Sequence, residues 1–181
     1  MFLEMRNAYY IKLGRGGKWE EDSIKRGRLR IGWSGIPLGL IRHGQWNQIR
    51  RRVSDSKALR RICEASPEDI WITFYQHRLW WCRLRRAEMR EDRISKYRNV
   101  KGEWSDSNLK GDRLTLDQIP GTIAAIQLYR ATRCRVKEIE ALRSLLIGEP
   151  TESYKKLEQA KSELPRLRSP QASGHFIGEA R

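Results

Sequence analysis

Residues 8–33 read AYYIKLGRGGKWEEDSIKRGRLRIGW, and this stretch decides the fold prediction. It begins with the Tyr- and Ile-rich run 8–13, which alternates loosely and predicts a strand. Three glycines at positions 14, 16 and 17 predict a turn, and one helical turn capped near Asp22 or Ser23 follows. The run Leu29–Trp33 alternates again and predicts a second strand that ends on a tryptophan. A tryptophan at a strand end could stack on a flat ligand.

The charge of the chain indicates that such a flat ligand is part of a polyanion. The 181 residues carry a formal net charge of +15, and the 37 basic residues comprise 11 lysines and 26 arginines. Arginine binds phosphate through a planar fork and also stacks on bases, which lysine does not do. The composition therefore favours nucleic acid over a membrane surface, because the basic residues are not confined to one amphipathic helix.

The rest of the chain predicts a mixed α/β unit of about five or six short strands with helices at both flanks. The strongest strand signal is Ile70–Tyr75, which turns through residues 76–78 into a second strand at residues 79–84. Further strands are expected at residues 94–100 and 134–136. Helices are expected at residues 45–53, from Ser54 or Ser56 to Cys63, and at residues 121–128, 137–147 and 151–164. The division we expect is one domain over residues 1–148, followed by a C-terminal helix and a tail or linker over residues 149–181.

Several classes of function lack their motifs. The three cysteines are widely spaced and the three histidines have no metal-ligand spacing, so neither a zinc site nor another metal site is expected. The glycine turn lacks the Gly-Lys-Ser/Thr end of a phosphate loop, and no Gly-x-Ser-x-Gly elbow is present. We expect no catalytic residues and no cofactor. Without a long apolar run or a signal peptide, a cytoplasmic protein is expected.

The seven tryptophans say more about function than the absent catalytic motifs do. Trp71 and Trp81 are expected in the core of the hairpin, whereas Trp33, Trp80 and Trp104 each lie at a strand end or in a loop. Converging aromatic rings can enclose a flipped base. Packing is the alternative for each ring alone, and only convergence would decide between the two.

The opening stretch resembles the YTH and EVE domains of the PUA-like superfamily. Tyr10-Ile11-Lys12-Leu13, Ser23-Ile24-Lys25 and Trp33-Ser34 follow the order and similar spacing of the first strand, helical turn and cage tryptophan of those domains. More broadly, Trp71-Ile72-Thr73-Phe74 and Leu79-Trp80-Trp81 are similar to the N-terminal module of Mrr-like restriction endonucleases, whose nuclease half this sequence does not contain.

The resemblance implies a PUA-like mixed β-barrel flanked by helices, with Trp33 as one wall of a base pocket and Trp80 or Trp81 as the other. Alternation alone does not decide between Trp80 and Trp81. Trp104 could close the rim, and Lys12 and Ser34 could contact the base edge. The phosphates would be bound by seven basic residues: Arg15, Lys18, Arg50, Arg51, Arg52, Arg85 and Arg86.

The function expected is therefore a non-catalytic reader of double-stranded DNA that flips a modified base, a methylated cytosine or N6-methyladenine, into an aromatic pocket within a restriction or defence system. Two alternatives remain open. The chain could be the specificity part of a restriction nuclease whose catalytic domain or subunit is separate, or it could bind RNA.

Overall fold

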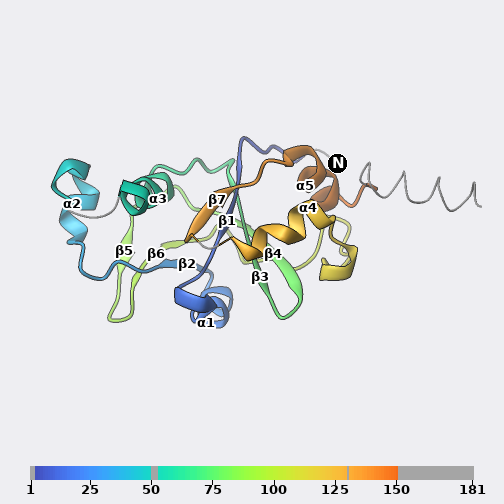
Figure 1. Cartoon of the computed structure of the whole chain (residues 1–181), viewed down its shortest axis with the longest axis horizontal. Helices are drawn as coiled ribbons and strands as arrows, with labels where there is room; N and C mark the ends of the chain where they lie inside the picture. The colour runs from blue at the N-terminus through green and yellow to red at the C-terminus, as the bar shows by residue number, and fades with distance from the viewer. Residues whose placement is uncertain (1–2, 50–52, 130, 151–181) are drawn as a thin grey trace, which may run out of the picture.

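The computed structural model describes residues 3–49, 53–129 and 131–150. Within these ranges the chain forms seven strands and five α-helices in a mixed α+β arrangement (Figure 1). The strands are β1 (Ala8–Ile11), β2 (Arg28–Ile31), β3 (Ile70–Tyr75), β4 (Arg78–Arg83), β5 (Arg90–Glu91), β6 (Lys96–Asn99) and β7 (Arg133–Arg135). The helices are α1 (Glu20–Lys25), α2 (Leu38–Arg42), α3 (Val53–Cys63), α4 (Gly121–Ala124) and α5 (Ile139–Ile147).

The strands form two sheets. The first has the order β4-β3-β1-β7, with β1 parallel to β3 and the other neighbours antiparallel. The second has the order β2-β6-β5, with both pairs antiparallel. An isolated bridge between Leu84 and Val100 joins the end of β4 to the end of β6. No closed barrel is found in the described ranges, so the structure establishes the mixed α+β class and not the barrel.

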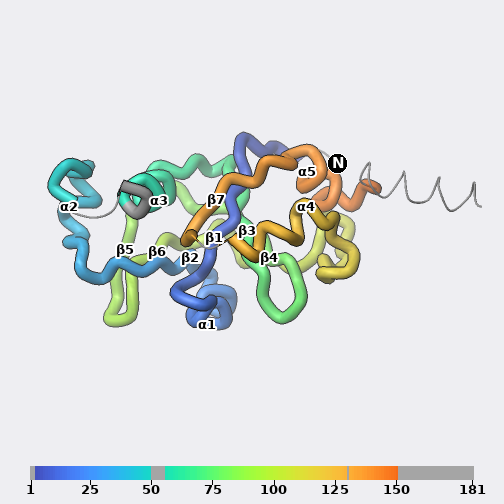
Figure 2. Tube along the Cα trace, viewed as in Figure 1, coloured from blue at the N-terminus to red at the C-terminus, as the bar shows by residue number. Residues whose placement is uncertain are grey.

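Both faces of the first sheet are covered, which explains why β1 is buried at every position. Tyr9 and Ile11 point into one core, which also contains residues of β2, α3, β3 and β4, whereas Ala8 and Tyr10 point into a second core under α4 and α5. Figure 2 shows α4 and α5 gathered at one end of the molecule and α2 at the opposite end. The first sheet is therefore the shared layer between two hydrophobic cores.

Most predicted elements are present, with shifted limits. The hairpin β3–β4 and helices α3 and α5 lie where the sequence predicted them. The helical turn near Asp22 begins earlier, at Glu20, so Asp22 lies inside the helix, where it does not cap the helix but binds an arginine of β2. In the described part of the helix expected at residues 45–53, a single 3-10 turn forms at Trp46–Gln48, and α2 forms before it; residues 50–52 lie outside the described residues. The predicted helix at residues 151–164 and the tail lie outside the described residues.

Candidate nucleic-acid interface

One cavity of about 610 Å³ opens beside the ends of β1 and β2. Its size lies within the range of small-ligand sites. Of the residues selected from the sequence, it brings together five, listed in chain order: Lys12, Arg15, Lys18, Trp33 and Ser34. The remaining walls are Gly14, Gly16, Trp19, Gly32, Ile94 and Thr132. We refer to this cavity as the Trp33 pocket.

The glycine turn after β1 forms one wall of the Trp33 pocket. Gly14 has a φ of 87°, and a Cβ there would lie 2.7 Å from Cε3 of Trp19, so only glycine lets the indole pack on the turn. The Lys18 ammonium lies 4.7 Å from the centre of the same indole. Trp19 is thus the second aromatic wall of the pocket. It is not among the base-binding residues expected from the sequence.

The opposite wall is the end of β2, where Trp33 adopts a left-handed backbone with φ of 65°. This conformation is uncommon for a bulky residue and needs support from its surroundings. The support is Lys96 of β6, whose side chain is fully buried and whose Nζ donates to the carbonyl oxygens of Trp33 at 3.1 Å and Ser34 at 3.4 Å. Its charge is balanced by Glu91, with Nζ 2.9 Å from Oε2. Lys96 therefore fixes the turn that presents the Trp33 ring.

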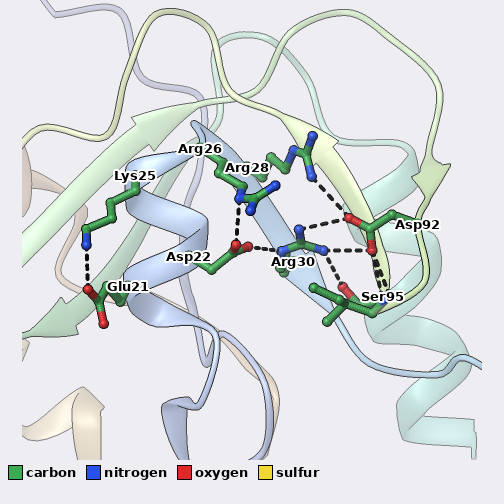
Figure 3. A network of polar contacts seen from close by, with 9 residues as sticks. Glu21, Asp22, Lys25, Arg26, Arg28, Arg30, Asp92 and Ser95 are labelled. Atoms are coloured by element: carbon green, nitrogen blue, oxygen red, sulfur yellow. Dashed lines mark hydrogen bonds and ion pairs between the residues drawn. The ribbon is translucent and has the colours of Figure 1, made fainter.

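A buried arginine links β2, α1 and the β5–β6 turn (Figure 3). The Arg30 side chain of β2 has no exposed surface; it binds Asp22 of α1 and also Asp92 and Ser95 of the β5–β6 turn, at 3.0 and 3.1 Å. The hydrogen bond from Arg30 keeps the pKa of Asp92 below its ordinary value. Asp92 also accepts the backbone N–H of Ile94 at 2.9 Å. The network thereby positions Ile94, which lines the pocket.

Two ionisable side chains, those of Lys12 and Glu20, lie near the C-terminal end of β1. Nζ of Lys12 donates to the carbonyl oxygen of Tyr129 at 3.2 Å, which ties the pocket wall to the segment before β7. Glu20 packs over Gly17, where a Cβ would overlap its carboxylate. Burial raises the pKa of Glu20 to about 7, and the charge of Lys12 partly opposes this shift.

The hairpin tryptophans do not join the Trp33 pocket, which corrects the expected convergence. Trp80 lines a separate hollow of about 410 Å³ with Trp104, and Trp81 lines a third one. Trp104 is 4% exposed, so it does not close any rim. The physical reason is strand pairing: β2 pairs with β6 and not with β4, so the hairpin faces other neighbours. Trp80 and Trp81 pack against opposite cores.

The predicted phosphate-binding residues divide into three groups. Arg15 and Lys18 are exposed on the Trp33 pocket. Arg85 and Arg86 are exposed after β4, away from the pocket lining, and Nε of Arg85 donates to the Val100 carbonyl at 3.1 Å. The third group, Arg50, Arg51 and Arg52, lies outside the described residues.

Groups that could support other chemistry are few. Among the described residues, no cluster of three or more His, Cys, Asp or Glu side chains could hold a metal ion. Burial raises the pKa of the Cys63 thiol to about 12, and it also raises that of Cys82. These thiols are therefore protonated at neutral pH and poor nucleophiles. None of the helices in the described ranges combines the length and apolar character that crossing a membrane requires.

In the comparisons with known proteins, no family model, no curated protein and no solved structure matches the chain.

Proposed function

We propose that this protein is a non-catalytic nucleic-acid-binding module that takes one modified base out of DNA into the Trp33 pocket. The observation that carries the proposal is the lining of that cavity, where two indoles and three cationic side chains meet without a carboxylate. Aromatic faces stack on bases, and lysine and arginine bind the flanking phosphates. The pocket therefore offers contacts for both the base and the phosphate of a nucleotide.

The proposed fold is PUA-like. In its support, the two sheets are linked by the Leu84–Val100 bridge and by backbone bonds from Arg85 N to Asn99 O and from Lys101 N to Arg83 O, at 3.0 and 2.7 Å. These bonds continue the pairing from β4 into β6, as a barrel wall would.

Titration of the full chain with labelled DNA duplexes tests the proposal. The duplexes carry one central N6-methyladenine, 5-methylcytosine, 5-hydroxymethyluracil or unmodified base. We expect one modified duplex to bind more tightly than its unmodified counterpart, and Trp33→Ala to remove about tenfold or more of that affinity, since stacking on one ring is worth about 1–3 kcal/mol.

Trp80→Ala is the matched control, because it removes the same side chain from a different hollow. It should leave the preference intact. Equal binding of all duplexes, unaffected by Trp33→Ala, would refute the proposal. Tighter binding of a single-stranded RNA than of every duplex would replace DNA by RNA as the ligand.

A further inference from the structure

The ionisable side chains of the Trp33 pocket are all cationic. Lys12, Arg15 and Lys18 line it, and no aspartate or glutamate does. Ammonium and guanidinium groups only donate hydrogen bonds, whereas the hydroxyls of Ser34 and Thr132 can donate or accept. Among the side chains of the pocket, the groups with a fixed hydrogen-bonding character are therefore donors.

Lys12 is the donor whose place is best defined. It follows β1 directly, and its backbone N–H binds the Thr132 carbonyl at 2.8 Å. Its side chain is half-buried, and one of its three N–H groups reaches Tyr129 O at 3.2 Å. Two N–H groups remain for a ligand. Arg15 and Lys18 are exposed at the same pocket, where they are free to follow a phosphate.

The bases differ in what they offer to such a donor. On the edge that carries the exocyclic group, guanine presents O6 and N7, and thymine and uracil present O4, all of them acceptors. Adenine presents its N6 amino group there beside the N7 acceptor, and cytosine presents its N4 amino group, so an ammonium placed at the exocyclic position would meet either of them donor to donor.

We infer that the Trp33 pocket selects a base with a keto oxygen on the edge facing Lys12, that is guanine, thymine or uracil, or a modified form of one of these. This inference rests on the proposed function, because it assumes that a base occupies the pocket. It makes Lys12 a specificity-determining residue, and Trp33 and Trp19 then contribute affinity for any base.

The direct test uses single-stranded oligonucleotides of abasic units with one central base, so that no duplex has to open. The probes form two matched pairs, hypoxanthine with adenine and uracil with cytosine, in which the exocyclic oxygen is exchanged for an amino group. N6-methyladenine, 5-methylcytosine and a fully abasic oligomer complete the set. By fluorescence anisotropy we expect the keto member of each pair to bind at least about tenfold more tightly.

Two variants assign the preference to a residue. Lys12→Gln replaces the ammonium by an amide that both donates and accepts, so the keto preference should fall to within about threefold of unity. Lys18→Gln removes one charge from the same pocket and should weaken all probes, the abasic one included, without changing the ratio. Circular dichroism and thermal unfolding show whether each variant is folded. The ratio of keto-base to amino-base affinity in the unaltered chain tests the preference itself without any variant.

The outcomes separate the inference from the proposed function. If bases bind better than the abasic oligomer but the amino or methylamino bases equal or exceed the keto bases, the inference is wrong and base binding stands. A preference that survives Lys12→Gln assigns the selection to another group and overturns the role of Lys12. If no probe binds better than the abasic oligomer, both the inference and the proposed function fail.

Discussion

Three tryptophans in and beside the β3–β4 hairpin differ from those of the Trp33 pocket in what their indole N–H groups do; a fourth, Trp71 of β3, is fully buried and its Nε1 has no partner among the described residues. Trp80, Trp81 and Trp104 each donate to a backbone carbonyl, those of Tyr75, Ser107 and Arg28, at 3.2, 2.8 and 3.0 Å. In the described part of the chain, no acceptor meets the N–H of Trp19 or Trp33, and both residues line the pocket.

The difference teaches how to separate structural from ligand-binding tryptophans. A buried indole that bonds to a distant carbonyl fixes two segments of the chain, as Trp104 does between its loop and β2. An indole at a cavity wall with a free N–H keeps its polar edge and its face for a ligand. The comparison predicts that alanine in place of a structural tryptophan lowers mainly stability, whereas alanine in place of a pocket tryptophan lowers mainly ligand binding.

The largest expected effect is on stability, from Trp104→Ala. The ring is 4% exposed and belongs to the first core, so its removal should cost about 3–5 kcal/mol of unfolding free energy. Trp33→Ala should cost about 1 kcal/mol or less, because the ring is only half-buried. Urea denaturation followed by circular dichroism measures both. Equal losses would break the comparison between the two groups.

The sequence predicted the elements best where the pattern is local. The continuous apolar run of β3 and the return strand β4 are found within one residue of their predicted limits, although the two turn residues, Gln76 and His77, carry no glycine or asparagine. Both adopt positive φ, 49° and 58°, as a tight two-residue turn requires. Strand propensity and alternation decided this hairpin, and the turn chemistry did not.

The candidate site was predictable only in its continuous part. Lys12, Arg15, Lys18, Trp33 and Ser34 all come from residues 12–34, so one strand-turn-helix-strand unit brings them together. The rest of the lining, Ile94 and Thr132, comes from distant segments. Whether a hairpin tryptophan reaches the pocket depends on which strand pairs with β2, a long-range choice that alternation within β4 does not report. The buried charges of Arg30 and Lys96 were missed for the same reason, since their burial depends on distant acidic partners.

A second prediction sharpens the comparison by disturbing Trp33 without touching its ring. Lys96→Met removes the donor to the Trp33 and Ser34 carbonyls, so the left-handed turn loses its support. We expect the affinity gained from a base, relative to the abasic oligomer, to fall about tenfold, as loss of a charged hydrogen bond suggests. Binding of the abasic oligomer should not change, because the exposed cations remain.

Glu91→Gln is the control for Lys96→Met. It removes the ion pair to Lys96 but leaves the ammonium free to donate to both carbonyls, and the Glu91 side chain is 43% exposed. Retained base affinity in Glu91→Gln together with its loss in Lys96→Met would identify positioning as the cause. An unchanged base increment in a folded Lys96→Met protein would contradict it.

A third, smaller effect is a pH dependence of stability on the pocket side of the molecule. The pKa of Glu20 is about 7 in the folded chain and near 4.5 when unfolded, so the folded state binds the proton more tightly. Its contribution to stability is therefore present below about pH 4.5 and lost as the pH rises towards 7 and above. We expect a loss of about 1–2 kcal/mol, less than the full shift because the carboxyl is partly solvated.

Urea midpoints at pH 5 and pH 8 measure this dependence. Glu20→Gln should flatten it, since the amide does not titrate, and Glu21→Gln, on an exposed neighbour of the same helix, should leave it as in the unaltered chain. A dependence of the same size in Glu20→Gln would place the titrating group elsewhere.

The smallest expected effect is on the salt dependence of binding, and it tests how far the basic surface extends from the pocket. Arg15 lines the Trp33 pocket, whereas Arg86 is exposed outside its lining. If a bound strand crosses only the pocket, Arg15→Gln should reduce the slope of log affinity against log salt by about 0.7–0.9, the value for one phosphate contact. Arg86→Gln should then leave the slope unchanged. Because both variants remove one exposed charge, equal reductions would show that the phosphate path also runs along the end of β4, and the hairpin region would share in binding after all.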